Sequence, residues 1–257
     1  YKKTGSCKVL VVTGCMAQRY KNEIIEEVPE VDAVLGTTSY GDILKAIREA
    51  MEGKHFQEFK DIDYLPEKLG KRVLTTGGHF GYLKIAEGCD KHCTYCIIPK
   101  LRGKFRSVPM ERLVTQAKEM AEEGVKELIL VAQETTVYGT DIYGKKSLHI
   151  LLKELCKIKG IRWIRVLYCY PEEIYDELIQ TMKEEKKICH YLDLPIQHAS
   201  DRILKRMGRR TTQAELVEIV NKLRREIPDI VLRTTLISGS RETRGRPQKT
   251  EWVLWMR

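Results

Sequence analysis

The chain has 257 residues, of which 42% are hydrophobic and 32% charged, a balance typical of a globular protein with a sizeable buried core. No run approaches the ~18 apolar residues that span a bilayer, and no secretory signal is visible, so we expect a cytoplasmic protein without a membrane span. The 45 lysines and arginines outnumber the 36 acidic residues, and the net charge of +9 favours a polyanionic partner such as RNA or a ribosome.

The first part of the chain predicts a parallel α/β sheet. Short strands are expected at 8–12 and 31–35, and helices at 23–27 and 40–51. Alternation of strands and helices is typical of a parallel sheet, of which this segment is at most half. Residues 53–80 lose the alternation and carry Pro66 and a Thr-Thr-Gly-Gly run, which predicts a linker with room for one short strand.

From residue 81 the alternation resumes. Strands are expected at 82–86, 127–132, 163–168, 191–196 and 230–237, and helices at 110–123, 148–158, 173–184, 201–207 and 213–226. Five repeats with buried parallel strands predict an open or closed α/β barrel, in which functional groups gather at the carboxyl ends of the strands.

Three cysteines follow the first strand of this region directly. Cys89, Cys93 and Cys96 have the spacing C-x3-C-x2-C, which can hold three irons of a 4Fe–4S cluster and leave the fourth iron open for chemistry. Structural zinc is the competing hypothesis, but it normally takes four ligands, and His92 is too close to Cys93 in the chain to share a tetrahedron well. The eight cysteines of an expected cytoplasmic protein also favour metal chemistry over disulfides.

This loop resembles that of the radical S-adenosylmethionine superfamily. The resemblance implies a partial parallel (βα)6-type barrel over residues 81–239, with five strands present. It also implies S-adenosylmethionine bound to the open iron by its amino and carboxylate groups, an external electron donor, and a 5′-deoxyadenosyl radical. Two interpretations stay open for Tyr95, which either packs on the cofactor or only packs within its loop. For Gln133, Thr135 and Thr136, the alternatives are contact with cofactor or substrate and simple capping of the strand end.

The segment Val-Thr-Gly-Cys-Met-Ala-Gln-Arg-Tyr at 12–20 resembles the last cysteine block of the methylthiotransferases within this superfamily. Their N-terminal domain is flavodoxin-like, and three of its cysteines hold a second 4Fe–4S cluster. Only Cys15 is recognisable here, and Cys7 is interpreted as a bystander. Residues 1–52 are therefore expected to be the C-terminal part of that domain, and 53–80 the linker to the barrel.

Two branches of the methylthiotransferases differ after the second barrel strand. The branch that modifies an isopentenylated adenosine in tRNA reads Gln-Asn-Val-Asn. The block Gln133–Thr136 reads Gln-Glu-Thr-Thr, close to the Gln-Asp-Thr-Thr of the branch that adds a methylthio group to the β-carbon of an aspartate in a small-subunit ribosomal protein near the decoding centre. The second activity is favoured. The tRNA activity, an inactive fragment and a metal-stabilised RNA-binding module remain alternatives.

The end of the chain departs from the family. After Gly239 the family continues Phe-Pro-Gly-Glu-Thr, whereas this chain reads Ser-Arg-Glu-Thr at 240–243. Residues 240–257 do not resemble the family's next helix, sixth strand and small RNA-binding β-barrel. A shifted reading frame would account for this tail, and we expect truncation at both ends.

Other polar residues and thiols have simpler interpretations. A basic run after the cluster loop either meets an acidic or ribosomal surface or is a solvated loop; it comprises Lys100, Arg102, Lys104 and Arg106. His198, beside Gln197, is interpreted as a core histidine rather than an acid–base group. Cys156, Cys169 and Cys189 lie inside helix and strand patterns and are assigned to packing.

Overall fold

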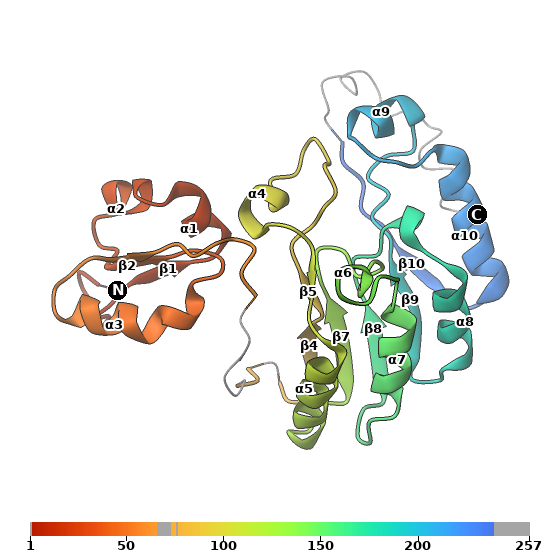
Figure 1. Ribbon diagram of the computed structural model, residues 1–257, viewed down its shortest axis with the longest axis horizontal. Helices are drawn as coiled ribbons and strands as arrows, with labels where there is room; N and C mark the ends of the chain where they lie inside the picture. The colour runs from red at the N-terminus through yellow and green to blue at the C-terminus, as the bar shows by residue number, and fades with distance from the viewer. Residues whose placement is uncertain (1, 66–72, 76, 239–257) are drawn as a thin grey trace. The chain divides into compact units, whose positions relative to one another are not determined.

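A computed structural model describes residues 2–65, 73–75 and 77–238 (Figure 1). The tail predicted at 240–257, together with Gly239 and Pro66, lies outside the described residues. Two compact units divide the chain, and each is described by itself. The first combines residues 1–72 with 88–90 and 97–104, and the second combines 73–87, 91–96 and 105–257.

The first unit contains a parallel three-stranded sheet. Its strands pair in the order β1 (Val11–Thr13), β2 (Ala33–Leu35) and β3 (Phe56–Glu58). The unit also contains α1 (Cys15–Tyr20), α2 (Glu23–Glu27), η1 (Tyr40–Asp42), α3 (Ile43–Met51) and α4 (Ile98–Arg102). The strand β3 is the one for which the segment 53–80 had room.

The central strand β2 is buried on both faces. Val34 packs with Ala17 of α1, while Ala33 and Leu35 pack with Ala46 of α3. Since successive side chains of a strand point to opposite faces, α1 and α3 cover opposite faces of the sheet. This is the two-sided helical cover that parallel sheets require.

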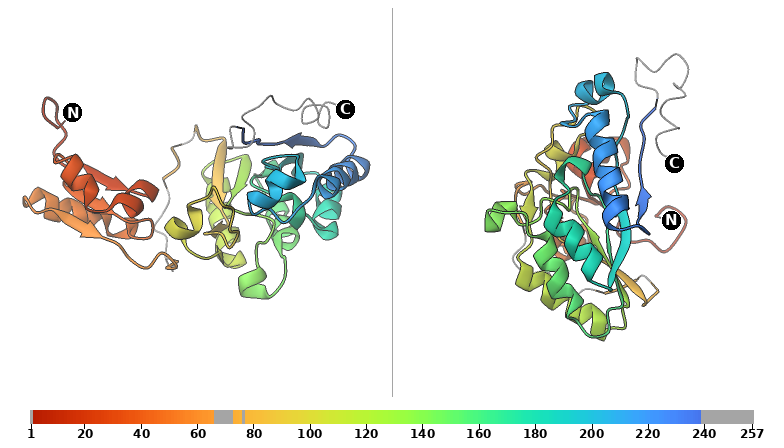
Figure 2. Two further views of the ribbon diagram at one scale, coloured as in Figure 1. Left: turned by 90° about the horizontal axis from the view of Figure 1, so that it is seen from above. Right: turned by 90° about the vertical axis from the view of Figure 1, so that its right-hand side faces the viewer.

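The second unit is built on five parallel strands in the order β10-β9-β8-β7-β4. These are β4 (Phe80–Lys84), β7 (Glu127–Val131), β8 (Trp163–Val166), β9 (Ile188–Asp193) and β10 (Val231–Arg233). The main helices that follow the first four are α5 (Met110–Glu122), α7 (Leu148–Cys156), α8 (Asp176–Glu184) and α10 (Gln213–Glu226). Because sequential parallel strands joined by right-handed crossovers place their helices on one side, these helices cover one face (Figures 1 and 2). The predicted five-stranded partial barrel is confirmed.

Short elements surround the carboxyl ends of these strands. An antiparallel pair is formed by β5 (Ala86–Glu87) and β6 (Arg106–Ser107). The others are α6 (Thr140–Tyr143), η2 (Pro171–Glu173) and α9 (Asp201–Arg206). No described helix of the chain has the length and apolar character needed to cross a membrane.

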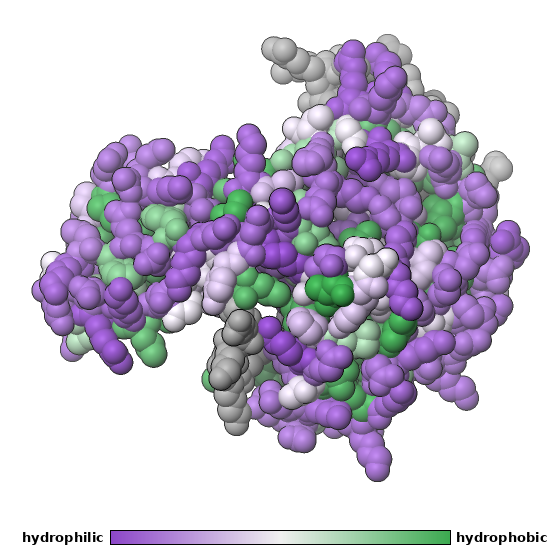
Figure 3. Space-filling view, viewed as in Figure 1, coloured by the Kyte–Doolittle hydropathy of each residue, from purple (hydrophilic) through white to green (hydrophobic). Residues whose placement is uncertain are grey.

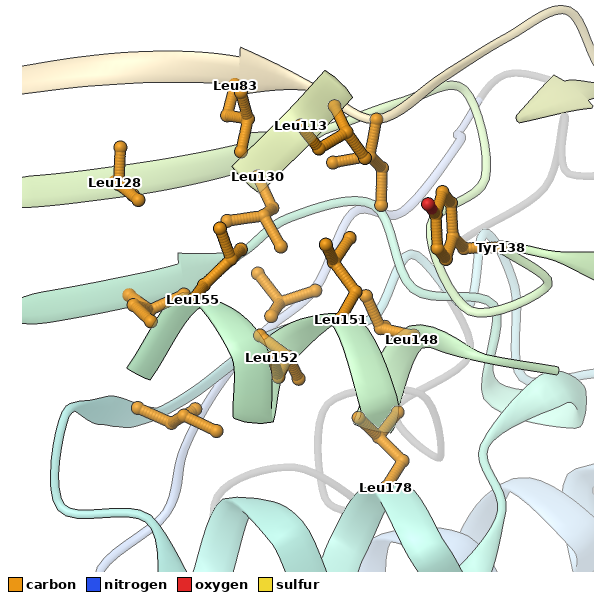
Figure 4. Close-up of a cluster of buried hydrophobic side chains, with 14 of the residues drawn as sticks. Leu83, Leu113, Leu128, Leu130, Tyr138, Leu148, Leu151, Leu152, Leu155 and Leu178 are labelled. Atoms are coloured by element: carbon orange, nitrogen blue, oxygen red, sulfur yellow. The ribbon is translucent and has the colours of Figure 1, made fainter. Parts of the chain in front are cut away.

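The core of the second unit lies between the sheet and its helices (Figure 4). Leu128 and Leu130 alternate along β7 and are completely buried. Four leucines of α7 recur at positions 148, 151, 152 and 155, the spacing of one helical face, and all four are completely buried. The visible outer surface is mostly hydrophilic, with separate small apolar patches (Figure 3).

Candidate functional site

The end of α9 holds part of the cysteine loop in the second unit. The amide of Cys96 donates to the carbonyl of Cys93 at 3.0 Å, which closes a turn between the two cysteines. At Thr94 the amide donates to the carbonyl of Met207 at 3.0 Å, and the hydroxyl donates to the carbonyl of Arg206 at 3.0 Å. A segment more than one hundred residues later in the chain therefore fixes this turn.

Cys89 belongs to the first unit, where a glycine precedes it. The amide of Cys89 donates to the carbonyl of Gly103 at 3.2 Å. Gly88 has a φ of +79°, and a Cβ at this position would collide with the carbonyl oxygen of Lys104. Only glycine fits such a close approach of two backbone segments.

Cys15 begins α1, directly after Gly14 with its φ of +98°. Its Sγ accepts a hydrogen bond from Nε of Arg102 at 3.2 Å. The same segment is fastened by Thr37, whose buried hydroxyl donates to the carbonyl of Leu101 at 2.8 Å. Arg102 therefore faces a thiol within the first unit.

The four cations of the basic run after the cysteine loop differ in solvent exposure. The side chains of Lys100 and Lys104 are exposed, whereas Arg102 and Arg106 are partly buried. Solvent or a partner can therefore reach Lys100 and Lys104, whereas Arg102 and Arg106 are partly covered.

Most hydrogen-bonding groups of Gln133–Thr136, a block that begins two residues after β7, close the end of this strand. Thr135 donates its amide to the carbonyl of Tyr168 at 3.1 Å and its hydroxyl to the carbonyl of Leu167 at 2.8 Å. Thr136 donates both its amide and its hydroxyl to Oε1 of Glu134. By contrast, Oε1 of Gln133 and Oε2 of Glu134 are buried with no hydrogen-bond partner among the described residues.

Glu134 is a buried acid at the carboxyl end of the sheet, only 1% exposed. Burial raises the pKa of its carboxyl to about 7, against the opposing hydrogen bonds from Thr136 and the charge of Lys91. Sequence reasoning considered its neighbours but not Glu134, because only the folded structure shows that this position is removed from water.

Arg209 is a buried cation beside the same strand ends. Its side chain is 0% exposed, and Nη2 donates to Oε2 of Glu172 and to the carbonyl of Pro195, each at 3.3 Å. Nε and Nη1 are buried without a partner among the described residues. The guanidinium carbon lies 4.3 Å from the ring centroid of Tyr170. Nothing in the local sequence, Gly-Arg-Arg at 208–210, distinguishes Arg209 from its neighbour.

Tyr170 connects these groups to the cysteine loop. Its hydroxyl lies 3.8 Å from Sγ of Cys93, and its amide donates to Oε1 of Glu134 at 3.4 Å. Nζ of Lys91 lies 5.2 Å from the centroid of the tyrosine ring. The second unit therefore gathers one predicted ligand, a buried acid and two cations around a single tyrosine.

Tyr95 stands between the two cysteines of the turn. Its side chain is 44% exposed, and the part that is covered, together with neighbouring Cys93, raises the pKa of its hydroxyl. An exposed aromatic ring beside a predicted ligand is compatible with both interpretations of this residue.

The donor set fits an iron–sulfur cluster by residue type. All eight cysteines lie in the described part of the chain, and none forms a disulfide. Within residues 2–65, 73–75 and 77–238, no three His, Cys, Asp or Glu side chains are gathered closely enough to hold a metal ion. The assignment of Cys89, Cys93 and Cys96 therefore depends on their thiol chemistry and spacing.

The three cysteines assigned to packing and His198 have structural surroundings. Cys156 and Cys169 are buried and Cys189 partly so, and burial raises the pKa of each thiol, which favours the unreactive protonated form. His198 is 4% exposed, and its Nδ1 accepts a hydrogen bond from the amide of Ser200 at 3.0 Å. These environments agree with assignment to packing.

A surface groove of the second unit lies away from these residues. It has a volume of about 610 Å³ and is lined by residues of α7, α8 and α10, including His149, Lys153 and Asp176. None of the predicted site residues lines it, so it gives no support to the predicted chemistry.

Comparison with protein families matches residues 83–243 to the Radical SAM superfamily. The ribosomal protein uS12 methylthiotransferase RimO of Lachnoclostridium phytofermentans is 67% identical over 239 residues, covering 93% of this chain and 54% of that protein. The protein of the same name from Clostridium perfringens (strain 13 / Type A) is 55% identical over 241 residues, with coverages of 93% and 54%. The chain spans about half the length of these curated relatives.

Among solved structures, the cobalamin-dependent S-adenosylmethionine radical enzyme OxsB, with aqua-cobalamin and S-adenosylmethionine bound, is similar to this chain. The TM-score is 0.64 at 16% identity, covering 89% of this chain and 36% of that one. At this identity the likeness shows a shared fold.

Proposed function

This chain belongs to the Radical SAM superfamily, and from that premise we propose that it acts in an enzyme that adds a methylthio group to the β-carbon of an aspartate in ribosomal protein uS12. The observation that carries the proposal is the 67% identity to a curated uS12 methylthiotransferase over 93% of the chain. Because the chain spans about half of that relative, the proposed activity is that of the whole protein.

The proposed cofactors are a 4Fe–4S cluster on Cys89, Cys93 and Cys96, and S-adenosylmethionine. When bound together and reduced by an external electron donor, they supply a 5′-deoxyadenosyl radical that removes a hydrogen atom from an unactivated carbon. The residues of this chain contribute the thiolate ligands and the orientation of the cofactor. The glycine at position 88 supports the first ligand by allowing the close approach of residues 103 and 104.

Two buried groups are complementary to the amino-acid end of S-adenosylmethionine. That end carries one ammonium and one carboxylate. The unpartnered Oε2 of Glu134 offers a hydrogen-bond acceptor to the ammonium, and the unpartnered Nε and Nη1 of Arg209 offer charged donors to the carboxylate. Both residues contact Tyr170, which places them in one neighbourhood. Oε1 of Gln133 is a further acceptor there, Thr135 and Thr136 close the strand end around it, and Tyr95 is the proposed aromatic contact.

A second 4Fe–4S cluster is proposed for the whole protein, with Cys15 as one of its ligands. Cys15 lies at the start of α1, and its sulfur accepts a hydrogen bond from the charged side chain of Arg102.

The proposed partner is a small-subunit ribosomal protein in the cytoplasm, bound either as the free protein or as part of the ribosome. Contact with RNA is also proposed. The net charge of +9 suits a polyanionic neighbourhood, and the exposed Lys100 and Lys104 offer cations next to the cluster loop.

Anaerobic reconstitution followed by iron and sulfide quantification tests the cluster. We expect about four irons per chain for one cluster, lost in Cys93→Ala and kept in Cys189→Ala, a matched thiol assigned to packing. Iron content that is equal in the two variants, or tightly held zinc instead, would contradict the assignment.

Substrate trials test the activity. The full-length protein that contains this chain, reduced and supplied with S-adenosylmethionine and sulfide, is offered uS12 in one reaction and tRNA carrying isopentenyladenosine in another. Mass spectrometry should find a methylthio group on an aspartate of uS12. Modification of the tRNA alone would transfer the assignment to the tRNA branch.

A further inference from the structure

We propose that Tyr170 is a positioning residue that raises the reduction potential of the cluster proposed on Cys89, Cys93 and Cys96, by donating a hydrogen bond to the sulfur of Cys93. This inference rests on the proposed function, since it requires the cluster. It assigns a role to a residue that follows β8, far from the cysteine motif in the sequence.

The direction of the hydrogen bond follows from the chemistry of the sulfur. The hydroxyl of Tyr170 and Sγ of Cys93 lie 3.8 Å apart, and either atom could donate while both carry a proton. A cysteine that binds iron does so as a thiolate, which has no proton to give. The tyrosine is then the only possible donor of this pair, and the sulfur accepts a charge-assisted hydrogen bond.

Two cations lie against the tyrosine ring. Nζ of Lys91 is 5.2 Å and the guanidinium carbon of Arg209 is 4.3 Å from its centroid. Each cation is itself fixed by an acid of η2, Lys91 by Glu173 and Arg209 by Glu172. Positive charge next to the ring withdraws electron density from the hydroxyl and makes it a stronger donor.

A donor at the sulfur changes the equilibrium of a one-electron step. Reduction adds one electron from a chemical or protein reductant to the cluster and its thiolates, and no bond to Cys93 forms or breaks. The reduced form carries one more negative charge, so hydrogen bonds to the thiolate sulfurs stabilise it more than the oxidised form. Tyr170, with Lys91 and Arg209 on its ring, therefore favours the reduced cluster.

A merely structural role for Tyr170 makes a different prediction. The ring and the amide of this residue also pack against Arg209 and Glu134, and loss of such packing changes stability. Removal of one hydroxyl leaves the ring and the backbone in place. A change in potential without a change in iron content therefore separates the two roles.

The experiment is a redox titration of the reconstituted chain with dithionite, monitored by electron paramagnetic resonance, on Tyr170→Phe and Tyr175→Phe. Tyr175 is the matched control, since it is also a partly buried tyrosine of the second unit, with its hydroxyl bonded to His149 rather than a cysteine. We expect Tyr170→Phe to weaken the affinity of the cluster for the electron about tenfold, which is 59 mV for a one-electron couple. The control should titrate as the wild type does.

A second pair of variants keeps the test decisive if Tyr170→Phe fails to hold the cluster. Lys91 and Lys146 both pair with Glu173, and each lies over a tyrosine ring, Lys91 over Tyr170 and Lys146 over Tyr175. Replacement of either by methionine removes one charge and one ion pair with the same acid. We expect Lys91→Met to lower the potential and Lys146→Met to leave it close to the wild-type value.

The outcomes separate this inference from the function beneath it. Lower potentials confined to the Tyr170 and Lys91 variants support the tuning role. Equal potentials in a variant and its control overturn it and leave the proposed function in place. A wild-type chain that binds no iron overturns the proposed function, and the tuning role with it.

Discussion

Glu134 makes the stability of the second unit depend on pH. Its carboxyl has a pKa of about 7 in the folded chain and 4.5 as the ordinary value, so between these values the folded state keeps a proton that the unfolded state has lost. Stability therefore falls as pH rises through this window, by about 3 kcal/mol in all. We expect Glu134→Gln to be more stable than wild type at pH 8 and much closer to it at pH 5, measured by urea unfolding. A difference independent of pH would contradict this.

Arg209 makes a prediction about cofactor binding. In Arg209, Nε and Nη1 have no hydrogen-bond partner among the described residues and can donate to a bound cofactor. Lysine keeps the positive charge but lacks this planar set of donors. We expect Arg209→Lys to weaken the binding of S-adenosylmethionine about tenfold, as a lost charge-assisted hydrogen bond implies, measured by calorimetry on the reconstituted chain. Arg225→Lys, on an exposed arginine of α10 paired with Glu226, is the control and should bind as wild type does.

The sequence alone predicted a role for some residues of the candidate site and not for others. A cluster on Cys89, Cys93 and Cys96 could be predicted because three thiols at this short spacing are typical of iron–sulfur ligands. Tyr170, Glu134 and Arg209 were not predicted, because their roles depend on burial and on contacts across 36 to 77 positions of the chain. Local sequence carries no record of such contacts.

The connection after α9 makes a prediction at the level of elements. Gly208 has a φ of +72°, and a Cβ there would stand 2.8 Å from the carbonyl oxygen of His92 in the cysteine loop. Gly144 has a similar φ of +68°, with nothing near its absent Cβ. Alanine at either position strains the backbone by about 1 kcal/mol. We expect only Gly208→Ala to lower the iron content as well. Equal iron in both variants would show that α9 does not position the loop.

The main strands and helices were predicted well because each carries a strong apolar pattern. The errors lie at their carboxyl and amino ends. The strand expected to reach 168 ends at Val166, just before Tyr168 takes a φ of +59°. The helix expected from 173 begins at Asp176, because Pro171 starts a separate 3-10 turn. Where these elements begin and end depends on local backbone geometry near the candidate site, which a periodic apolar pattern does not record.

Among the described residues, each of the two compact units has buried hydrophobic clusters of its own, and each unit is therefore expected to unfold in its own transition. Leu151 is completely buried in the main cluster of the second unit, and Val34 in one of the two clusters of the first unit. We expect Leu151→Ala to destabilise the second unit by about 2–5 kcal/mol and to leave the other transition unchanged, with Val34→Ala acting in the reverse sense. Differential scanning calorimetry measures both. A single transition lowered by either variant would show that the units unfold together.

At this scale the five-stranded sheet was predictable, because alternation of elements fixes the order of parallel strands. The edge strand was predicted at 230–237, yet β10 covers only Val231–Arg233, followed by a single bridge between Gln197 and Leu236. The division of the cysteine loop between two compact units could not be predicted. It depends on contacts of Gly88 and Gly103 that no periodic pattern records.

The support of the cysteine loop by α9 has a consequence for the order of events during protein synthesis. Thr94 is held by the carbonyl of Arg206, which is 112 residues further along the chain. At about 5–20 residues per second, the ribosome needs roughly 6–22 s to make that stretch. Until then the cysteines are outside the tunnel without the segment that shapes their turn. Insertion of iron and sulfide is therefore expected to follow translation of nearly the whole second unit.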